Sequence, residues 1–478
     1  MFWNFENIEP NKIALIDDDS GDFYSYLELN KKIDELVNKL KFSSKKLIFS
    51  FCDNSAKSII FYLSVLRSCD AIFLANSKMD SELKKRLISI YQPDIIFSVE
   101  EINFELTSYE KIFLENKFYF YKTKNTNNIS VHKDLAVLLS TSGTTGSPKL
   151  VKLSYKNIQA NAESISEYLN ITESEKPITS LPMSYSFGLS VINSHLLKGA
   201  TILCSNKSMV MREFWSTFNL QKCTSFSGVP YNYQMLQRLK FDKMDLPTLK
   251  TMTQAGGRLS EEFIKYFYDA AINKKIKFFV MYGQTEATAR ISYVPFENLG
   301  NKIGSIGIPI PGGKIKIFSD SEEISSPNEQ GELVYFGDNV MMGYAESRED
   351  LSEGDLLKGE LHTGDLAYKD TDGFIYITGR LKRFIKLFGL RVNLDEVEKM
   401  LENNFSCPAA CYGNDDSLKV LLQKRSNHIS EAAKKKIIDI YKIHHSVVDV
   451  RCVDSIPVTS SGKKDYNLIK EMKFNECN

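Results

Sequence analysis

The sequence predicts an α/β protein with a large N-terminal domain and a small C-terminal one. Apolar, strand-like runs alternate with amphipathic helical segments from the N-terminus to about residue 320, and the character of the chain changes again in its last hundred residues. Alternation of this kind is typical of parallel-rich sheets flanked by helices. At 478 residues the chain is also long for one hydrophobic core, because domains average about 150 residues.

The first elements illustrate this alternation. Residues 46–53 (KLIFSFCD) fit a buried strand, residues 55–69 (SAKSIIFYLSVLRSC) a helix, and residues 70–76 (DAIFLAN) the next strand. The run LAVLL at 135–139 predicts a further short buried strand. Between 303 and 336, GSIGIPIPGGKIKIFSD and GELVYFG combine short apolar runs with Gly and Pro turns, which predicts a small β unit.

The C-terminal part has its own pattern. In residues 362–387, a Thr-Asp-Gly turn separates two strand-like runs, and NLDEVEKMLENN at 393–404 places an Asn before an acidic first turn, as at a helix start. We place the boundary near 380–382, which gives domains 1–380 and 381–478. The basic stretch EAAKKKIIDIYKI is interpreted as a solvated helix face.

Composition narrows the class of protein. Sixty basic and sixty acidic residues leave a formal charge of zero, so no global field favours nucleic acid. The start lacks the pattern of a signal peptide and no run is long enough to span a bilayer, so we expect a cytoplasmic protein without a membrane span. The eight cysteines are scattered without zinc-site spacing and are expected to be reduced and mostly buried.

The segment LSTSGTTGSPKLV at 139–151 carries the first chemical signal. Its glycines allow backbone amides to approach an anion, and its hydroxyls and single lysine add donors, so the composition suits a polyphosphate. It is not a Walker A loop, because Pro148 stands where a Gly-Lys pair is needed. A polar linker is the alternative for such a run taken alone.

With further motifs the chain resembles the adenylate-forming superfamily, which includes acyl-CoA synthetases, peptide synthetase adenylation domains and firefly luciferase. The motifs follow in order: STSGTTGSPK, PMSYSFGLS, TQAGGRLS, YGQTEAT, GELVYFG, HTGDLA, TGRLKRFIKLFGLRVNLDEVE and PVTSSGKKDY. They extend over nearly the whole chain. The resemblance implies a carboxylic acid ligase that uses ATP, Mg²⁺ and CoA, or carrier-protein phosphopantetheine, and whose small C-terminal domain is mobile.

The resemblance also implies an ATP site formed by Ser140, Thr141, Ser142, Gly143, Thr144, Thr145, Gly146, Lys149, Gly256, Gly257, Tyr282, Gly283, Gln284, Thr285, Asp365, Ile377, Arg380 and Lys463. In it, Tyr282 stacks on adenine, Thr285 contacts the α-phosphate, and Glu286 binds magnesium together with Thr145. Asp365 and Arg380 hold the ribose and phosphate. For these two residues, a capping Asp and a surface ion pair are the alternatives.

Catalysis is assigned by the same resemblance to Lys463, with Thr285 and Glu286. Attack of a carboxylate on the α-phosphate concentrates negative charge, which a lysine on a mobile loop neutralises. The hinge matches Lys382. The thiol entrance matches Lys386, Gly389 and Arg391.

The carboxylic acid is expected to bind in a substrate pocket formed by Tyr185, Gly188, Val229 and Gly256. Members that activate α-amino acids keep an Asp where this chain has Gly188, so an α-amino acid is disfavoured. Tyr185 suits an uncharged chain, unless it is an ordinary packed tyrosine. A carrier-loading enzyme and an inactive nucleotide-binding scaffold remain the alternatives to a CoA ligase, and the sequence leaves the oligomeric state open.

Overall fold

The computed structural model describes the chain except for residues 41, 115–117, 125–128, 141–148, 320–321, 382, 388–389, 415, 425–426, 442, 460–462 and 473–478. Its contacts divide the chain into two compact units. Unit 1 comprises Met1–Lys314 and Tyr335–Leu361, and unit 2 comprises Ile315–Val334 and His362–Asn478. The α/β fold class predicted from the sequence is confirmed, whereas the domain boundary near 380–382 stays a prediction.

Unit 1 is built around an eight-stranded sheet whose centre is parallel. Its strands, in spatial order, are β19 (Gly343–Ala345), β9 (Leu150–Ser154), β8 (Leu135–Ser140), β4 (Ala71–Asn76), β3 (Leu47–Cys52), β5 (Ile95–Ser98), β7 (Phe118–Thr123) and β6 (Tyr109–Leu114). The pairs β3–β4, β3–β5 and β4–β8 are parallel, and the outer pairs are antiparallel. The strands predicted near 46–53, 70–76 and 135–139 are therefore confirmed.

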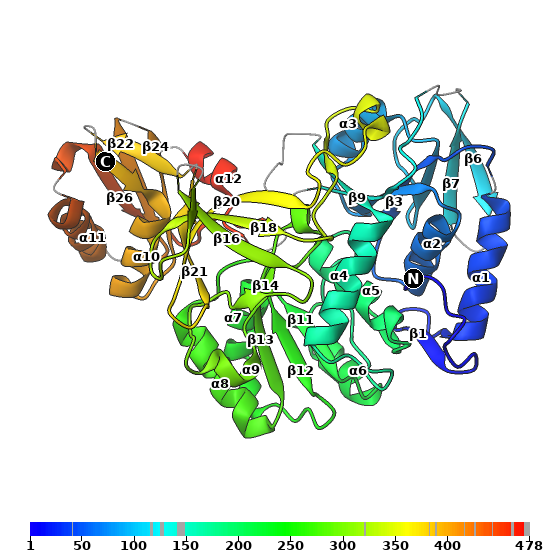
Figure 1. Ribbon diagram of the computed structural model, residues 1–478, viewed down its shortest axis with the longest axis horizontal. Helices are drawn as coiled ribbons and strands as arrows, with labels where there is room; N and C mark the ends of the chain where they lie inside the picture. The colour runs from blue at the N-terminus through cyan, green and yellow to red at the C-terminus, as the bar shows by residue number, and fades with distance from the viewer. Residues whose placement is uncertain are drawn as a thin grey trace. The chain divides into compact units, whose positions relative to one another are not determined.

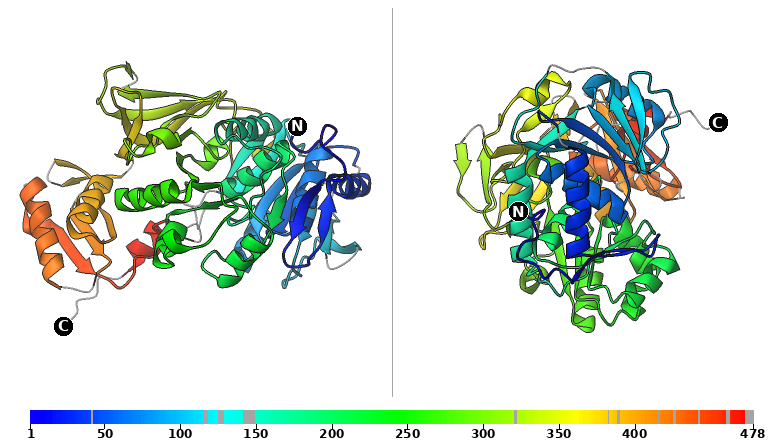
Figure 2. Two further views of the ribbon diagram at one scale, coloured as in Figure 1. Left: turned by 90° about the horizontal axis from the view of Figure 1, so that it is seen from below. Right: turned by 90° about the vertical axis from the view of Figure 1, so that its right-hand side faces the viewer.

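Both faces of this sheet are buried, which explains why its central strands are continuously apolar. On one face, Ile48 and Ile72 pack with residues of α1 (Tyr26–Lys39), α2 (Ala56–Arg67) and α4 (Tyr155–Tyr168). On the other, Phe49 and Phe73 pack with α3 (Ser81–Tyr91). Helices α1 and α2 lie side by side (Figure 2), as do α4 and α5 (Ser186–Leu197) (Figure 1).

A second sheet of unit 1 supports most of the candidate site. Its strands are β11 (Ser225–Gly228), β12 (Thr251–Gln254), β13 (Lys277–Tyr282), β14 (Ser292–Tyr293) and β15 (Ile308–Pro309), of which the first three are parallel. Near it are α6 (Arg212–Leu220), α7 (Pro230–Arg238), α8 (Glu261–Lys274) and α9 (Phe296–Leu299), with α8 beside β13 (Figure 1). A small sheet joins β10 (Ile202–Cys204), β1 (Ile13–Asp17) and β2 (Phe23–Ser25).

Unit 2 contains residues 315–334 of the β unit predicted around residues 303–336, together with the C-terminal elements. Its five-stranded sheet has the order β17 (Glu322–Ile324), β16 (Lys314–Ser319), β18 (Gly331–Phe336), β20 (Glu360–Lys369) and β21 (Ile375–Arg380). The hairpin β22 (Phe384–Leu387) and β23 (Leu390–Asn393) and the sheet β24 (Ala409–Asn414), β25 (Ser417–Leu422) and β26 (Val448–Cys452) follow, with α10 (Leu394–Phe405), α11 (Asn427–Tyr441) and α12 (Tyr466–Glu471).

Local chemistry explains two of these C-terminal elements. Strands β20 and β21 form the antiparallel pair expected around the Thr-Asp-Gly turn. Helix α10 begins where the sequence predicts, because Asn393 caps it by accepting hydrogen bonds from the amides of Asp395 and Glu396. Both local predictions are confirmed.

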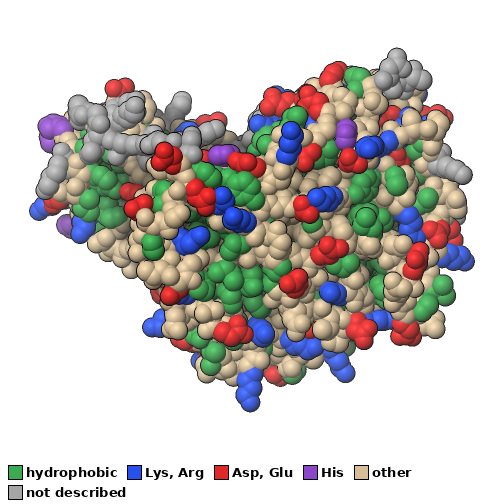
Figure 3. Space-filling view, viewed as in Figure 1, with side chains coloured by type: hydrophobic (Ala, Val, Ile, Leu, Met, Phe, Trp, Pro, Cys, Tyr) green, Lys and Arg blue, Asp and Glu red, His purple; other side chains and the backbone are tan. Residues whose placement is uncertain are grey.

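The distribution of charged side chains and the burial of the cysteines agree with what the composition predicts. Basic and acidic side chains are interspersed over the face seen in Figure 3. Within the described residues, no helix is long and apolar enough to cross a bilayer. Most of the free cysteines are buried, namely Cys52, Cys204, Cys223, Cys407 and Cys411.

Candidate active site

The Ser/Thr/Gly-rich segment is framed by two paired strands. Strand β8 ends at Ser140, which pairs with Leu150 of the antiparallel β9. The two ends of the segment are thereby held together by the sheet. The expectations for Thr141, Ser142, Gly143, Thr144, Thr145 and Gly146 lie outside the described residues.

Lys149 lies between an aromatic ring and a carboxylate. Its Nζ is 3.7 Å from the ring centroid of Tyr344 and 3.7 Å from Oε1 of Glu346. The side chain keeps about a third of its surface exposed. The ammonium is therefore oriented by weak, solvent-screened contacts and stays able to meet an incoming anion.

Tyr344 also orients Glu286, the carboxylate expected to bind magnesium. Its hydroxyl donates a hydrogen bond of 2.8 Å to Oε1 of Glu286. Burial, and then the charge of Glu286, raise the pKa of Tyr344, so the phenol stays a proton donor. The backbone beside the carboxylate is also fixed, because the amide of Met341 donates to the carbonyl of Glu286 at 2.9 Å.

The donor set around Glu286 fits a magnesium ion shared with phosphates. Among the residues described here, no group of three or more His, Cys, Asp or Glu side chains forms a protein cage for a metal. Mg²⁺ is commonly held by one or two carboxylates, with substrate phosphates and water completing its octahedron. A single oriented carboxylate near Lys149 matches that arrangement.

The YGQTEAT segment follows β13 and turns sharply. The amide of Gln284 donates from Nε2 to the Tyr282 hydroxyl at 3.1 Å, and Gly283 lies between them. The hydroxyls of Thr285 and Ser186 are 3.3 Å apart. This contact brings the turn to the start of α5, the helix that carries Gly188 and directly follows Tyr185.

Asn339 holds the far side of this turn and was missed by the sequence analysis. Its Nδ2 donates to the carbonyls of Ala287 at 2.9 Å and Arg290 at 2.8 Å. The hydroxyl of Thr288 donates to the carbonyl of Asn339 at 2.7 Å. Thr288 has a φ of 63°, so this network offsets a strained backbone conformation.

The structure brings together Tyr185, Val229 and Gly256. Gly256 has a φ of +82°, and a Cβ there would lie 2.5 Å from the Tyr185 hydroxyl and 3.0 Å from Cγ1 of Val229. A side chain at 256 would therefore fill the space in front of the tyrosine. Burial raises the pKa of Tyr185, so its hydroxyl is neutral. Gly257 lies beside Pro230.

Gly188 has a packing role of its own in α5. A Cβ at this position would lie 2.2 Å from the carbonyl oxygen of Pro182 and 2.7 Å from that of Leu181. Those backbone atoms cannot yield as a flexible side chain would. An aspartate at 188 would therefore require the chain before α5 to move.

In unit 2, Asp365 and Arg380 are cross-strand partners in β20 and β21. Arg380 donates from Nε to Oδ1 of Asp365 at 3.0 Å, with the carboxylate side chain 4% and the guanidinium side chain 61% exposed. The amide of Asp365 donates to the hydroxyl of Thr363 at 3.1 Å, and Ile377 pairs with Ala367 in the same ladder.

Lys463 lies in a short turn whose backbone is hydrogen-bonded. Its amide donates to Oγ1 of Thr459 at 3.2 Å, and the amide of Thr459 donates to the Lys463 carbonyl at 2.7 Å. The turn continues into an isolated bridge between Val458 and Lys464. The backbone amide and the carbonyl of Lys463 are therefore both hydrogen-bonded to Thr459.

Lys464, missed by the sequence analysis, anchors this turn to α10. Its Nζ donates to Oε2 of Glu398 at 2.8 Å and to Oε1 of Glu402 at 2.9 Å. Burial lowers the pKa of Lys464, but the two carboxylates outweigh burial, so the net pKa is raised. Glu398 also accepts from Nη2 of Arg383 and from the hydroxyl of Tyr466, at 2.8 and 2.9 Å.

The expected hinge and thiol entrance are largely outside the described residues. This applies to Lys382 and Gly389. Lys386 and Arg391 pair with each other across the hairpin of β22 and β23, and their side chains are likewise outside the description.

Two of the residues that the sequence analysis missed reach the site by contacts remote in sequence: Tyr344 by strand pairing, and Asn339 by its side-chain hydrogen bonds. Strand β19 places Tyr344 opposite Val151 of β9. No local spacing in the sequence reports such a contact. The sequence signal that could have identified Tyr344 is its position, because GYAES follows soon after the GELVYFG motif.

Comparisons with known proteins identify the family of this chain. The family model described as AMP-binding enzyme matches residues 2–345. An oxalate–CoA ligase of Arabidopsis thaliana is 28% identical over 71% of this chain and 67% of its own length, and a long-chain-fatty-acid–CoA ligase of Bacillus subtilis is 29% identical over 71% and 63%. The chain therefore spans about two thirds of the length of these relatives.

Solved structures share the fold. The o-succinylbenzoate CoA synthetase of Bacillus subtilis, in complex with its acyl-adenylate intermediate, aligns with a TM-score of 0.78 at 24% identity. The alignment covers 98% of this chain and 97% of the synthetase. The α/β fold expected from the sequence is therefore shared by a solved structure of similar length.

Proposed function

Since the chain belongs to the AMP-binding enzyme family, we propose that it is an ATP-dependent carboxylic acid ligase. A carboxylate oxygen attacks the α-phosphorus of ATP, and the bond to pyrophosphate breaks, which leaves an acyl-adenylate. The sulfur of a thiol then attacks the acyl carbon, the thiol proton is lost, and AMP leaves with the bond electrons. The product is a thioester.

The observation that carries this proposal is the cluster of Lys149, Tyr344 and Glu286. It presents an ammonium and an oriented carboxylate at the end of the Ser/Thr/Gly-rich segment. Such a pair suits a polyphosphate together with its counter-cation, since the ammonium meets phosphate oxygens and the carboxylate meets the metal. Bound Mg²⁺ would neutralise phosphate charge as pyrophosphate departs.

The remaining nucleotide contacts are assigned by the same proposal. Tyr282 stacks on adenine beside the Gly256–Gly257 segment, and Thr285 donates to the α-phosphate. In unit 2, Asp365 accepts from the ribose hydroxyls, oriented by Arg380. Thr145 joins Glu286 at magnesium, as expected from its motif. A solved structure of the Bacillus subtilis o-succinylbenzoate CoA synthetase contains ATP and a magnesium ion, which supports this choice of ligands.

Lys463 supplies the positive charge that the adenylation step requires. The neighbouring Lys464 holds the turn on α10, so Lys463 acts from a defined backbone. Rotation about Lys382 would exchange Lys463 for the residues at the thiol entrance, Lys386, Gly389 and Arg391, between the two half-reactions.

Coenzyme A is the proposed thiol, because the relatives named above are CoA ligases. A carrier-protein phosphopantetheine is the second candidate, as both thiols carry the same reactive arm. Purified protein, ATP and a panel of acids should release AMP in amounts that rise with added free CoA. AMP release with a pantetheinylated carrier and none with CoA would favour the carrier.

The inactive-scaffold alternative is tested by nucleotide binding and turnover together. Asp365→Ala should weaken ATP binding, because the ribose hydroxyls lose their acceptor. Unchanged nucleotide affinity in a calorimetric titration would remove Asp365 from the ribose site. Binding of ATP without AMP formation from any acid would favour a scaffold.

A cytoplasmic location is proposed on the strength of the free, mostly buried cysteines, because free thiols are typical of reducing compartments. Cell fractionation would test it directly.

A further inference from the structure

Arg290 is a buried cation that lies directly after the YGQTEAT turn. Arg290 exposes only 2% of its surface to solvent. Within the described part of the chain, its Nε has no hydrogen-bond partner, and Nη1 reaches the carbonyl of Ala289 at 3.4 Å. The guanidinium carbon lies 3.9 Å from the ring centroid of Phe187. No described carboxylate forms an ion pair with it.

The charge of this guanidinium persists despite its burial. Burial lowers the pKa of Arg290, while the hydroxyls of Tyr168 and Tyr185 raise it in part. An arginine nonetheless stays protonated in proteins. Ring faces and neutral hydroxyls compensate a buried charge only partly, and a buried charge without a counter-ion is costly. The buried guanidinium of Arg290 would therefore be stabilised by an anion bound next to it.

A small cavity with a mostly apolar lining adjoins the guanidinium. It has a volume of about 30 Å³, and Arg290 shares its lining with Ser190 and Ser194 of α5 and with Ser225 and Ser227 of β11. The hydroxyl of Ser225 also lacks a partner among the described residues. The other three hydroxyls are engaged, because Ser190 and Ser194 donate to the carbonyls of Phe187 and Val191 and Ser227 pairs with Thr253. This leaves Nε of Arg290 and the hydroxyl of Ser225 as buried donors without an acceptor among the described residues, and such donors are suited to carboxylate oxygens.

Two titratable groups face the same cavity, and neither neutralises Arg290. His195 donates from Nδ1 to the carbonyl of Val191 at 2.8 Å, and burial keeps it neutral near pH 7. Glu175 accepts from the hydroxyl of Thr224 and pairs with Lys250 at 3.4 Å. Its carboxylate is already engaged elsewhere.

The cation lies next to the proposed acid pocket. Phe187, which stacks on Arg290, is two residues after Tyr185, and the two rings have centroids 6.4 Å apart. The Tyr185 hydroxyl in turn faces the open space in front of Gly256. Phe187 therefore links the guanidinium to Tyr185 of the proposed acid pocket.

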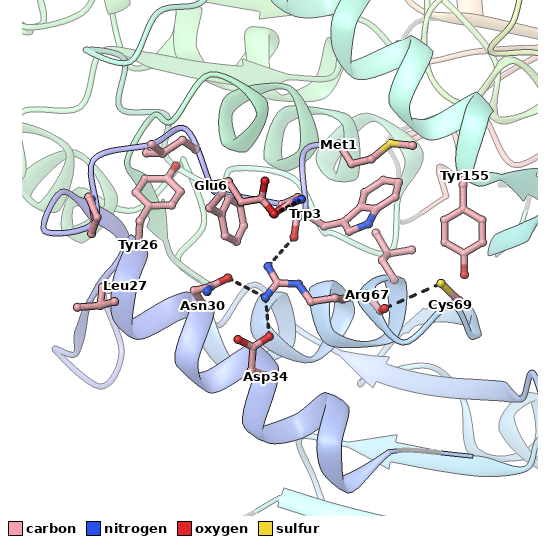
Figure 4. A pocket seen from close by; sticks show the side chains of 15 residues that line it. Met1, Trp3, Glu6, Tyr26, Leu27, Asn30, Asp34, Arg67, Cys69 and Tyr155 are labelled. Atoms are coloured by element: carbon pink, nitrogen blue, oxygen red, sulfur yellow. Dashed lines mark hydrogen bonds and ion pairs between the residues drawn. The ribbon is translucent and has the colours of Figure 1, made fainter. Parts of the chain in front are cut away.

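Two other arginines of the chain, Arg67 and Arg348, each pair with a carboxylate of the protein. Arg67, beside a cavity of about 730 Å³ lined by the N-terminal segment, donates to Asn30, Asp34 and the carbonyl of Trp3 at 2.7 to 2.8 Å (Figure 4). Arg348, which is also buried, pairs with Asp94 at 3.0 Å. Arg290 differs from both by having no such carboxylate.

We propose that the acid activated by this chain is a dicarboxylic acid, whose second carboxylate pairs with Arg290 while the first attacks ATP. This inference rests on the proposed ligase function and names its substrate class. It replaces the uncharged chain favoured by the sequence analysis.

The test compares matched acids that differ only in the distal charge. Succinate and glutarate, and their half-amides succinamate and glutaramate, are assayed for ATP-dependent AMP formation with CoA. Wild type should prefer at least one diacid over its half-amide by about 30-fold or more in kcat/KM, the range expected for a buried charge pair. Equal or reversed preference in wild type overturns the proposal.

Variants assign the preference to its residue. Arg290→Gln should bring the diacid-to-half-amide ratio close to one, mainly by raising KM for the diacid. Arg290→Lys, which keeps the charge but not the planar fork, should retain part of it. Arg67→Gln is the matched control, because it removes a guanidinium with its own partners, and it should keep the wild-type ratio. A preserved ratio in Arg290→Gln overturns the assignment.

A binding measurement separates this inference from the ligase proposal. With a non-hydrolysable ATP analogue present, the diacid should raise the melting temperature of wild type, and this shift should be lost in Arg290→Gln. If the shift appears without any AMP formation, the ligase proposal fails and the anion site stands. If AMP forms equally well from half-amides, the anion site fails and the ligase proposal stands.

Discussion

His195 provides a quantitative test of the packing around the proposed acid pocket. The residue is 6% exposed in α5, and burial lowers its pKa from 6.5 to about 4. The hydrogen bond from Nδ1 to Val191 fixes the tautomer but does not outweigh burial. The imidazole is therefore neutral in the folded protein over a pH range in which the unfolded chain takes up a proton.

The sign and size of the effect follow from this difference. Because the folded pKa is the lower one, the contribution is complete above pH 6.5 and is lost as the pH falls towards 4. At about 1.4 kcal/mol for each unit of pKa, the fall from 6.5 to about 4 corresponds to roughly 3 kcal/mol of unfolding free energy. Below pH 4, both states are protonated and the loss stops.

The assay is urea unfolding of wild type and His195→Asn at pH 7.5, 5.5 and 4.5. Trp3 and Trp215 both belong to unit 1, so tryptophan fluorescence follows the unit that contains the histidine. The asparagine amide keeps a donor for the Val191 carbonyl but does not titrate. Wild type should lose about 2.5 kcal/mol more than the variant between pH 7.5 and 4.5, because the last part of the loss comes only below pH 4.5. Parallel losses in the two proteins would refute the reasoning.

Three further predictions concern single contacts. Tyr344→Phe removes the hydroxyl that orients Glu286. It should lower kcat/KM at limiting Mg²⁺ by about tenfold without a change in melting temperature. An unchanged dependence of kcat/KM on Mg²⁺ concentration would contradict this prediction. Lys464→Met leaves the buried Glu398 without its ammonium, and should destabilise unit 2 by about 2 kcal/mol, measured by thermal unfolding. Gly256→Ala places a methyl group against the Tyr185 hydroxyl, and should raise KM for the acid several-fold and by a larger factor than KM for ATP.

Local sequence patterns predicted much of this fold because each reports on its own segment. The apolar run at 135–139 became β8, and Asn393 caps α10 as expected. The pair of Asp365 and Arg380 was assigned to one site from motifs only, and the structure places the two residues opposite each other in a ladder.

What the sequence could not provide were contacts between remote segments. Tyr344 reaches Glu286 because β19 pairs with β9, and Asn339 holds the turn near Arg290 by its side-chain amide. Arg290 itself stands in the run ATARISYV, where a cation in an otherwise apolar segment was a usable signal. Gly188 was interpreted as a missing carboxylate, whereas its backbone surroundings leave no space for a side chain.

The central claim is that this chain joins AMP to a carboxylic acid with the help of Lys463. Acid-dependent exchange of labelled pyrophosphate into ATP, measured without any thiol, tests it most directly because only the adenylation step contributes. Wild type should exchange label only when an acid is present, and Lys463→Ala should slow the exchange about 100-fold or more. Exchange that needs no acid, or that persists near the wild-type rate in Lys463→Ala, would contradict the claim.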